Sequence, residues 1–364
     1  MKSRRLDLLS QSLRTSRVAR RMTERAKIAA SVATGFVRGF LDGSGHATNG
    51  HNRRVEPIGT TDGAKGERAS LADHLGALVE KRLERLSQCR QWQSSDDPVE
   101  AIHDLRVASR RLRAFVDVFR PLLDADVYDR TERPLRRITR AARSIRDLDV
   151  QTSLLVERLD RAASDAERAA LEHLLEELET GRSRAERRAK KRLSNVDFAE
   201  LRVSISTALG ETVARLPHDR PGTAALALDL IQPFIDQASR DRPPDDGLEY
   251  PDEMHLLRID LKKLRYGLEL FEPAFGEHYE PLHDRVEALQ ELLGHHHDLV
   301  VLGGVVEEHA ERLKRKNRST LIVGLDTLND ELSRERRQLL ARFRTDGFEP
   351  DWWERSVRSA LASA

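Results

Sequence analysis

One motif occurs twice in this 364-residue chain, and this repeat constrains the fold more than any other feature. Residues 102–121 read IHDLRVASRRLRAFVDVFRP, and residues 254–273 read MHLLRIDLKKLRYGLELFEP. A shorter match follows each copy, with SIRDLDV at 144–150 and HHHDLVV at 295–301. Two motifs that recur in the same order indicate an internal duplication of one structural unit.

Basic side chains recur at helical spacing within each copy. An α-helix turns by about 100° per residue, so residues three or four apart share a face. In each copy one face carries a stripe of cationic side chains: His103, Arg106, Arg110 and Arg113, then His255, Arg258, Lys262 and Arg265. A separate face of the first copy is apolar: Leu105, Ala108, Leu112, Phe115, Val116 and Phe119. Both copies therefore predict an amphipathic helix whose polar face is basic.

A further basic run reinforces the first copy alone. Between Glu132 and Asp147 the chain carries six Arg residues and no acid. Four of these share a helical face: Arg133, Arg136, Arg140 and Arg143. The opposite side is apolar: Leu135, Ile138, Ala142 and Ile145. The corresponding segment of the second copy holds Glu287, Glu291 and three His, so the two walls of any cleft are expected to differ in charge.

Composition and helix breakers predict an all-α body at residues 67–350. Leu, Ala, Arg and Glu are frequent and aromatic residues make up 5%, a mixture that favours long helices. Breaks are expected near 94–98, 121–129, 195–197, 216–222, 240–251, 273–281, 316–319 and 348–350. The densest group of breakers, residues 217–222, divides the body into halves at about 67–216 and 222–347. Helices of this length joined by short loops suggest antiparallel bundles.

The two ends of the chain are interpreted separately. Residues 1–66 hold 13 Lys and Arg against 5 Asp and Glu, and we interpret them as a basic extension followed by a flexible linker. A disordered tail, a segment that adheres to an anionic surface and an organellar transit peptide all fit this composition. Residues 351–364 are expected to form a C-terminal tail. The body is net acidic, so a basic site there must arise from local patterning.

Several classes of protein are disfavoured. Cys89 is the single cysteine, which excludes an internal disulfide and fits a cytoplasmic setting. No run reaches the roughly 20 apolar residues of a membrane-spanning helix, and no secretory signal is evident. Phosphate-loop, HExxH and GxSxG motifs are lacking. We therefore expect no enzyme, no metal and no cofactor.

The repeated stripe itself favours an anionic ligand. Cations stacked three or four residues apart repel one another unless acids or a ligand compensate them. Arg meets phosphate oxygens with a planar fork, and a stripe about 10 Å long suits a polymer. His103 and His255 remain open as neutral hydrogen-bonding groups, metal ligands or charged phosphate contacts. Three consecutive residues, His295, His296 and His297, point about 100° apart and do not converge on one ion.

The motif H-x-x-R-[VI]-x-x-[RK]-[RK]-L-R, followed in the second copy by Tyr266, Glu269, Leu270 and Phe271, resembles the CHAD (conserved histidine α-helical domain) family. The resemblance covers roughly residues 68–345. It implies a duplicated four-helix bundle with a basic cleft between its halves. It also implies binding of inorganic polyphosphate, and association of some members with polyphosphate granules.

The resemblance carries phosphate contact onto ten motif positions and the tyrosine that follows: His103, Arg106, Arg110, Arg111, Arg113, His255, Arg258, Lys262, Lys263, Arg265 and Tyr266. Spacing alone adds Arg136, Arg140 and Arg143. We thus expect a non-enzymatic polyphosphate-binding protein of the cytoplasm, associated with polyphosphate granules. The alternatives are a polyphosphate or triphosphate hydrolase, which requires acids that hold a metal, and a nucleic-acid or nucleoid-associated protein.

Overall fold

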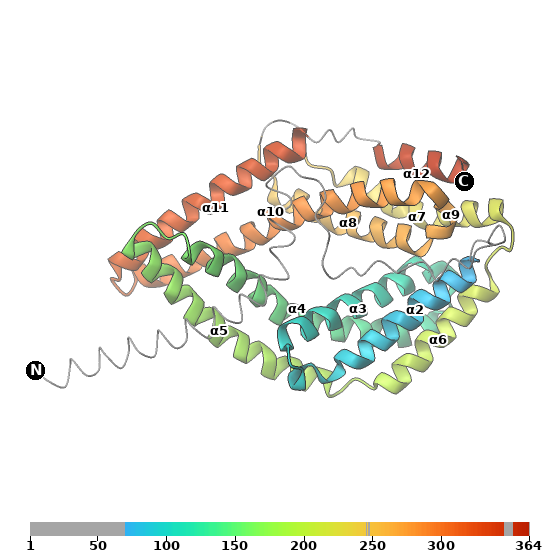
Figure 1. Cartoon of the computed structure of the whole chain (residues 1–364), viewed down its shortest axis with the longest axis horizontal. Helices are drawn as coiled ribbons and strands as arrows, with labels where there is room; N and C mark the ends of the chain where they lie inside the picture. Colours follow the sequence, from blue (N-terminus) through green and yellow to red (C-terminus); the bar gives the residue numbers. More distant parts are fainter. Residues whose placement is uncertain (1–69, 245, 247, 346–351, 364) are drawn as a thin grey trace, which may run out of the picture. The chain divides into compact units, whose positions relative to one another are not determined.

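A computed structural model describes residues 70–244, 246, 248–345 and 352–363, and this part of the chain is helical without β-strands (Figure 1). The all-α prediction is confirmed. The predicted basic extension, residues 1–66, lies outside the described residues. The longer elements are α2 (Leu71–Gln88), α3 (Pro98–Val118), α4 (Ala125–Leu159), α5 (Asp165–Leu193), α6 (Phe198–Ala214), α7 (Arg220–Arg240), α8 (Pro251–Leu270), α10 (Tyr279–Lys314), α11 (Ser319–Thr345) and α12 (Trp352–Ser363). Short elements join them: η1 (Cys89–Ser94), η2 (Arg120–Leu122), α9 (Glu272–Phe275) and η3 (Gly276–His278).

The chain forms two compact units. The first unit contains residues 146–185 and 306–328, and the second contains 70–145, 186–305 and 329–363, in each case counting described residues. Each unit takes segments from both copies of the repeat. The division between the two units therefore differs from the division between the halves expected at 67–216 and 222–347. The two copies of the motif lie on α3 and α8, and the helices with the shorter match, α4 and α10, are 35 and 36 residues long.

The core of the second unit lies between α2, α3, α7 and α8. Helix α3 packs against α2 and α8, and α8 packs against α7. The apolar face expected on α3 is buried, and its aromatic rings join those of α8. Phe119 lies 5.2 Å from Phe115 and 5.4 Å from Phe271 between ring centroids. Packing of these apolar faces leaves the basic faces of α3 and α8 to the site described below.

Helices begin or end at the expected breaks where a side chain caps the helix. Asp97 accepts hydrogen bonds from the backbone of Val99 and Glu100 at the start of α3. One break was missed, because residues 160–164 contain neither Gly nor Pro. There Ser164 accepts from the backbone N–H of Glu167, whose carboxylate accepts from the N–H of Ala163. This arrangement is close to a capping box, so the S-x-x-E spacing was the signal for the break.

The expected C-terminal tail contains helix α12, which packs on α7 and α9. Trp353 and Val357 of α12 are fully buried. The indole N–H of Trp353 donates a hydrogen bond to Ser239 Oγ of α7 at 2.8 Å. These contacts make α12 part of the second unit's core.

The first unit is built from the C-terminal part of α4, the N-terminal part of α5 and parts of α10 and α11. Arg182 of α5 donates to the buried carboxylate of Asp149 of α4 at 2.6 Å. Gly324 of α11 lies against α5, where an added Cβ would overlap the carbonyl oxygen of Ala166. Within the described residues, no helix has the length and hydropathy that crossing a membrane requires.

Candidate anion-binding site

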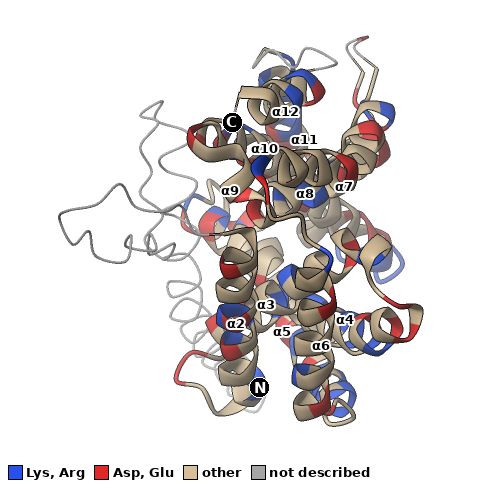
Figure 2. Cartoon of the chain, turned by 90° about the vertical axis from the view of Figure 1, so that its right-hand side faces the viewer, with Lys and Arg blue, Asp and Glu red and all other residues tan. Residues whose placement is uncertain are grey.

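The basic faces of α3 and α8 meet in the second unit, around Lys262. The two helices pack on each other, and their Lys and Arg positions are blue in Figure 2. Burial and the nearby charges of Arg110, Arg258, Arg106 and Arg265 lower the pKa of Lys262 to about 5. Lys262 forms no ion pair with any described residue. Cations from both copies of the repeat therefore surround one desolvated amino group.

Helices α4 and α10 add groups to this site. The rings of His255 and His297 stack with centroids 4.0 Å apart and an angle of 27° between planes. Burial, Arg258 and Arg143 all lower the pKa of His255. Burial, followed by Arg258 and His255, lowers the pKa of His297 to about 3. Four helices of the second unit thus converge on one electropositive region, and its charges disfavour protonation of both imidazoles.

Several polar atoms in this region are buried without a hydrogen-bond partner in the described part of the chain. They are Arg110 Nε, His255 Nδ1 and the hydroxyl of Tyr266, which is 4% exposed. The Arg110 guanidinium lies over the Tyr266 ring at 5.4 Å from its centroid. Buried polar groups are normally satisfied, and the guanidinium and hydroxyl donors among these atoms suit an anionic acceptor. His103 and Arg106 of α3 lie on the same stripe and are half-buried.

Two of the predicted phosphate contacts belong instead to a buried ion cluster around Glu269. Arg82 Nη2 lies 3.1 Å from Glu269 Oε2, and Arg111 and Arg265 lie 3.6 and 3.8 Å from Oε1. Arg265 also pairs with Glu287 at 2.5 Å. Burial alone would raise the pKa of Glu269, but Arg111, a hydrogen bond from His283, Arg82 and Arg265 lower it to about 2. These arginines have a protein anion as partner.

Three further predicted contacts are also paired with acids. Arg113 and Arg136 lie 3.2 and 3.1 Å from the two carboxylate oxygens of buried Glu132. Lys263 is exposed and pairs with Asp260 at 2.8 Å. Sequence reasoning missed Glu132 because it stands just before the arginine run, although its spacing of four residues from Arg136 was the available signal. Arg140 is exposed and has no ion pair with a described residue.

The three consecutive histidines of α10 have three different environments. His295 lies 2.7 Å from Glu335, and buried His296 lies 2.9 Å from Glu249. His297 stacks on His255. The 100° between successive helical side chains separates them in this way.

One group in the described part of the chain has the spacing of metal ligands: His283, Asp284 and Glu287, whose ligand atoms lie within 4.8 Å of one another. Glu287 already pairs with Arg265, and His283 with Glu269. A divalent cation bound here would compete with these ion pairs for the ligand atoms. The thiol of Cys89 is buried, and burial raises its pKa to about 11, so it is a poor nucleophile.

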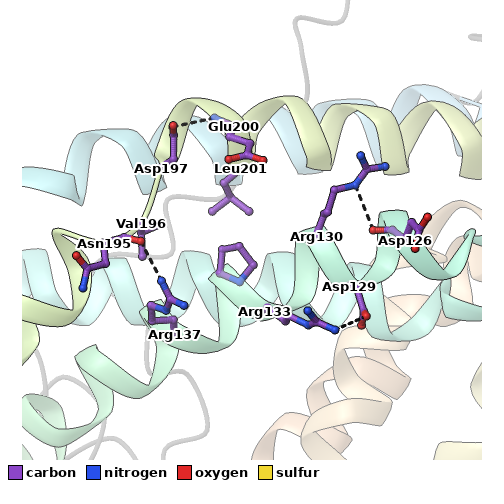
Figure 3. A pocket seen from close by; sticks show the side chains of 11 residues that line it. Asp126, Asp129, Arg130, Arg133, Arg137, Asn195, Val196, Asp197, Glu200 and Leu201 are labelled. Carbon is purple, nitrogen blue, oxygen red and sulfur yellow. Dashed lines mark hydrogen bonds and ion pairs between the residues drawn. The ribbon is translucent and has the colours of Figure 1, made fainter.

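A separate surface pocket of about 700 Å³ lies between the start of α4 and the α5–α6 turn (Figure 3). Its cations are engaged locally: Arg133 pairs with Asp129, Arg130 donates to the carbonyl of Asp126, and Arg137 donates to that of Asn195. Asp197 and Glu200 also line the pocket. Balanced charge makes it unsuited to a polyanion.

Known proteins resemble this chain in sequence and fold. The family model described as "CHAD domain" matches residues 77–307, more than half of the chain. The crystal structure of the CHAD domain from the plant Ricinus communis superposes with a TM-score of 0.53 at 22% identity, covering 82% of this chain and 93% of that one. PptA from Streptomyces chartreusis gives 0.52 at 18% identity, with coverages of 80% and 98%. No curated protein matches the chain. The sequence match and the shared helical fold together show that the chain belongs to the CHAD domain family.

Proposed function

We propose that this protein binds inorganic polyphosphate without catalysing a reaction on it. The observation that carries this proposal is the environment of Lys262, a desolvated amino group surrounded by four arginines. Charging a desolvated amino group beside other cations is strongly unfavourable, and an anion bound next to Lys262 would offset this cost. A polymer of phosphates supplies closely spaced negative oxygens, which suit the planar forks of Arg106, Arg110 and Arg258.

The length of the site supports a polymer over a single phosphate. His103 and Arg110 are seven residues apart on α3, or about 10 Å at 1.5 Å per residue. His255 and Lys262 have the same separation on α8, which packs on α3, and Arg106 and Arg110 of α3 lie near Lys262. A single phosphate would contact one part of these stripes, whereas a polymer can follow their whole length. We further propose that the protein is cytoplasmic and associates with polyphosphate granules.

A titration with long-chain polyphosphate across salt concentrations tests the proposal. We expect submicromolar binding that weakens steeply with salt, because neutralising phosphates releases counterions. The double charge reversal R106E/R258E should abolish binding. R315E/R318E, at exposed positions of the first unit, is the matched control and should bind as the unaltered protein does. Unchanged binding by R106E/R258E would refute the proposal.

A hydrolase of polyphosphate or triphosphate is the second candidate, and the spacing of His283, Asp284 and Glu287 is the observation in its favour. Phosphate release upon addition of Mg²⁺ or Mn²⁺, lost in E287Q, would establish it. A nucleic-acid-binding function is less well supported, because the stripes lack interleaved aromatic residues for stacking with bases. Duplex DNA as a competitor for bound polyphosphate distinguishes this function.

A further inference from the structure

The last turns of α5 carry a second concentration of positive charge, at Arg187, Arg188, Lys190, Lys191 and Arg192. We call these five residues the α5 basic run. All five side chains are exposed, and the segment contains no acid. None of the five forms an ion pair with a described residue. The run belongs to the second unit, which also contains the Lys262 site.

Ordinary stabilisation of a helix accounts for only part of this run, namely Lys190, Lys191 and Arg192 in the last turn. Cations near a helix C-terminus interact favourably with the dipole, but the effect is confined to about one turn. Within the run, Arg187 and Lys191 are four residues apart, and like charges at this helical spacing are destabilising. Some exposed cations elsewhere on the protein have a carboxylate partner, as in the pairs Arg133–Asp129, Arg161–Glu157, Arg202–Glu80 and Arg358–Glu354.

The α5 basic run lies beside the arginines Arg140 and Arg143 of α4. Arg137 Nη1 of α4 donates to the carbonyl of Asn195, just beyond the end of α5, at 2.9 Å. A five-residue connection at 160–164 joins the other ends of the two helices, so they run antiparallel. Both helices rise by the same distance per residue. Counted from these two points, the helical turn that contains Arg188 lies beside the turn that contains Arg140 and Arg143.

Burial shows which sides of the two helices face each other there. Ala141 of α4 and Ala189 of α5 are both 1% exposed. Arg140 directly precedes Ala141, and Arg188 directly precedes Ala189. In antiparallel helices these preceding residues project toward the same edge of the contact, so the two basic rows form one surface.

This surface is continuous with the Lys262 site. Arg143 is close enough to lower the pKa values of both His255 and His297. Arg140 lies one turn before Arg143 on α4, toward the α5 basic run. A row of cations therefore leads from the buried site, across α4, to the exposed end of α5. Adjacent rows of like charge are compensated when one anionic polymer follows both.

We propose that the α5 basic run binds the portion of a polyphosphate chain that emerges from the Lys262 site, and that it thereby makes the protein select long chains. The inference rests on the proposed function. The α3 and α8 stripes neutralise the charge of a short phosphate chain, and such a chain does not reach α5. A long chain gains further contacts with arginine and lysine, each of which releases counterions.

The test compares tripolyphosphate with long-chain polyphosphate as ligands of the full chain. The variant is R187Q/R188Q/K191Q, and the matched control is R315Q/K316Q/R318Q, which removes the same charge from exposed positions of the first unit. We expect the variant to lose at least about tenfold in affinity for the long chain, with the slope of log K against log salt reduced by about 2 for three lost contacts. Tripolyphosphate affinity should be unchanged.

The outcomes separate this inference from the proposed function. An unchanged long-chain affinity in the variant, or an equal loss for both ligands, overturns the role of the α5 basic run while polyphosphate binding stands. Loss of binding to duplex DNA without loss of long-chain polyphosphate also overturns it, and assigns the run to nucleic acid. If the unaltered protein binds neither phosphate ligand, the proposed function itself is wrong.

Discussion

At the scale of single residues, Lys262 determines how the site should respond to pH. Its pKa of about 5 means that the amino group is mostly neutral in the free protein at pH 7. A bound polyanion favours the charged form and raises this pKa. At a pH between the pKa values of Lys262 in the free and in the bound protein, binding must therefore take up protons. His255 and His297, whose pKa values are also lowered, add to the uptake.

We predict that polyphosphate affinity increases as pH falls from about 9 toward 6. Each proton taken up on binding makes the affinity change by up to about tenfold per pH unit. Calorimetric titrations in buffers of different ionisation enthalpy measure the number of protons directly. K262Q should take up about one proton fewer at pH 7. K316Q, at an exposed lysine of the first unit, is the control. Equal proton uptake by K262Q and the unaltered protein would contradict the assignment.

Glu269 has the opposite character, since its negative charge stabilises the folded protein. Its pKa of about 2 lies below the ordinary value of 4.5, so its stabilising contribution is present above about pH 4.5 and is lost as pH falls toward 2. We predict that E269Q lowers the free energy of unfolding at pH 7 by about 3–5 kcal/mol, because three arginines lose their buried partner.

Chemical denaturation at pH 7 and at pH 3 checks the Glu269 prediction. The difference in stability between E269Q and the unaltered protein should shrink at pH 3. E277Q, at an exposed position, should change stability by less than about 0.5 kcal/mol at either pH. A constant difference at both pH values would show that the carboxylate charge of Glu269 does not stabilise the fold.

At the scale of elements, periodicity predicted which helix faces are buried, and it could not predict which cations are neutralised. The apolar faces of α3 and α4 are in the core as expected. Arg113 and Arg265 share the stripe spacing of Arg110 and Lys262, yet they pair with Glu132 and Glu287 from neighbouring helices. Spacing within one helix contains no information about acids that another helix contributes. The break at 160–164 was missed for a local reason, the lack of Gly and Pro.

Gly324 shows how closely two helices of the first unit approach. An added Cβ would overlap the carbonyl oxygen of Ala166 and lie 2.7 Å from the Cβ of Ala170. Because the first contact is with backbone, α5 or α11 must shift to accept a side chain. We predict that G324A lowers the free energy of unfolding by about 1–3 kcal/mol.

The same substitution at an open helical position is the matched control for Gly324. Gly210 of α6 has no atom within 4 Å of an added Cβ and is exposed. Ala has the higher helix propensity, so G210A should stabilise the protein by about 0.5–1 kcal/mol. Denaturant unfolding of the two variants should therefore give changes of opposite sign. A stabilised G324A would disprove the close approach of α5 and α11.

At the scale of the whole molecule, the proposed polyanion site belongs to one compact unit. His103, Arg106, Arg110, Arg143, His255, Arg258, Lys262 and Tyr266 all belong to the second unit. The first unit, residues 146–185 and 306–328 among those described, contributes none of them. A ligand that binds only the folded state stabilises that state, by about 2.7 kcal/mol when the free ligand concentration is a hundredfold above Kd. Stabilisation by polyphosphate should therefore be unevenly distributed along the chain.

Hydrogen exchange with and without polyphosphate measures this distribution. We predict slower exchange of backbone amides in α3 and α8, because neutralising the facing cations removes the repulsion that favours local opening. Amides of α4 and α10 within the second unit should follow to a smaller degree, since each contributes fewer groups near His255. Amides of residues 306–328 should exchange at the same rate with and without ligand. R106E/R258E should show no protection anywhere. Protection confined to the first unit would relocate the site and contradict the assignment to α3 and α8.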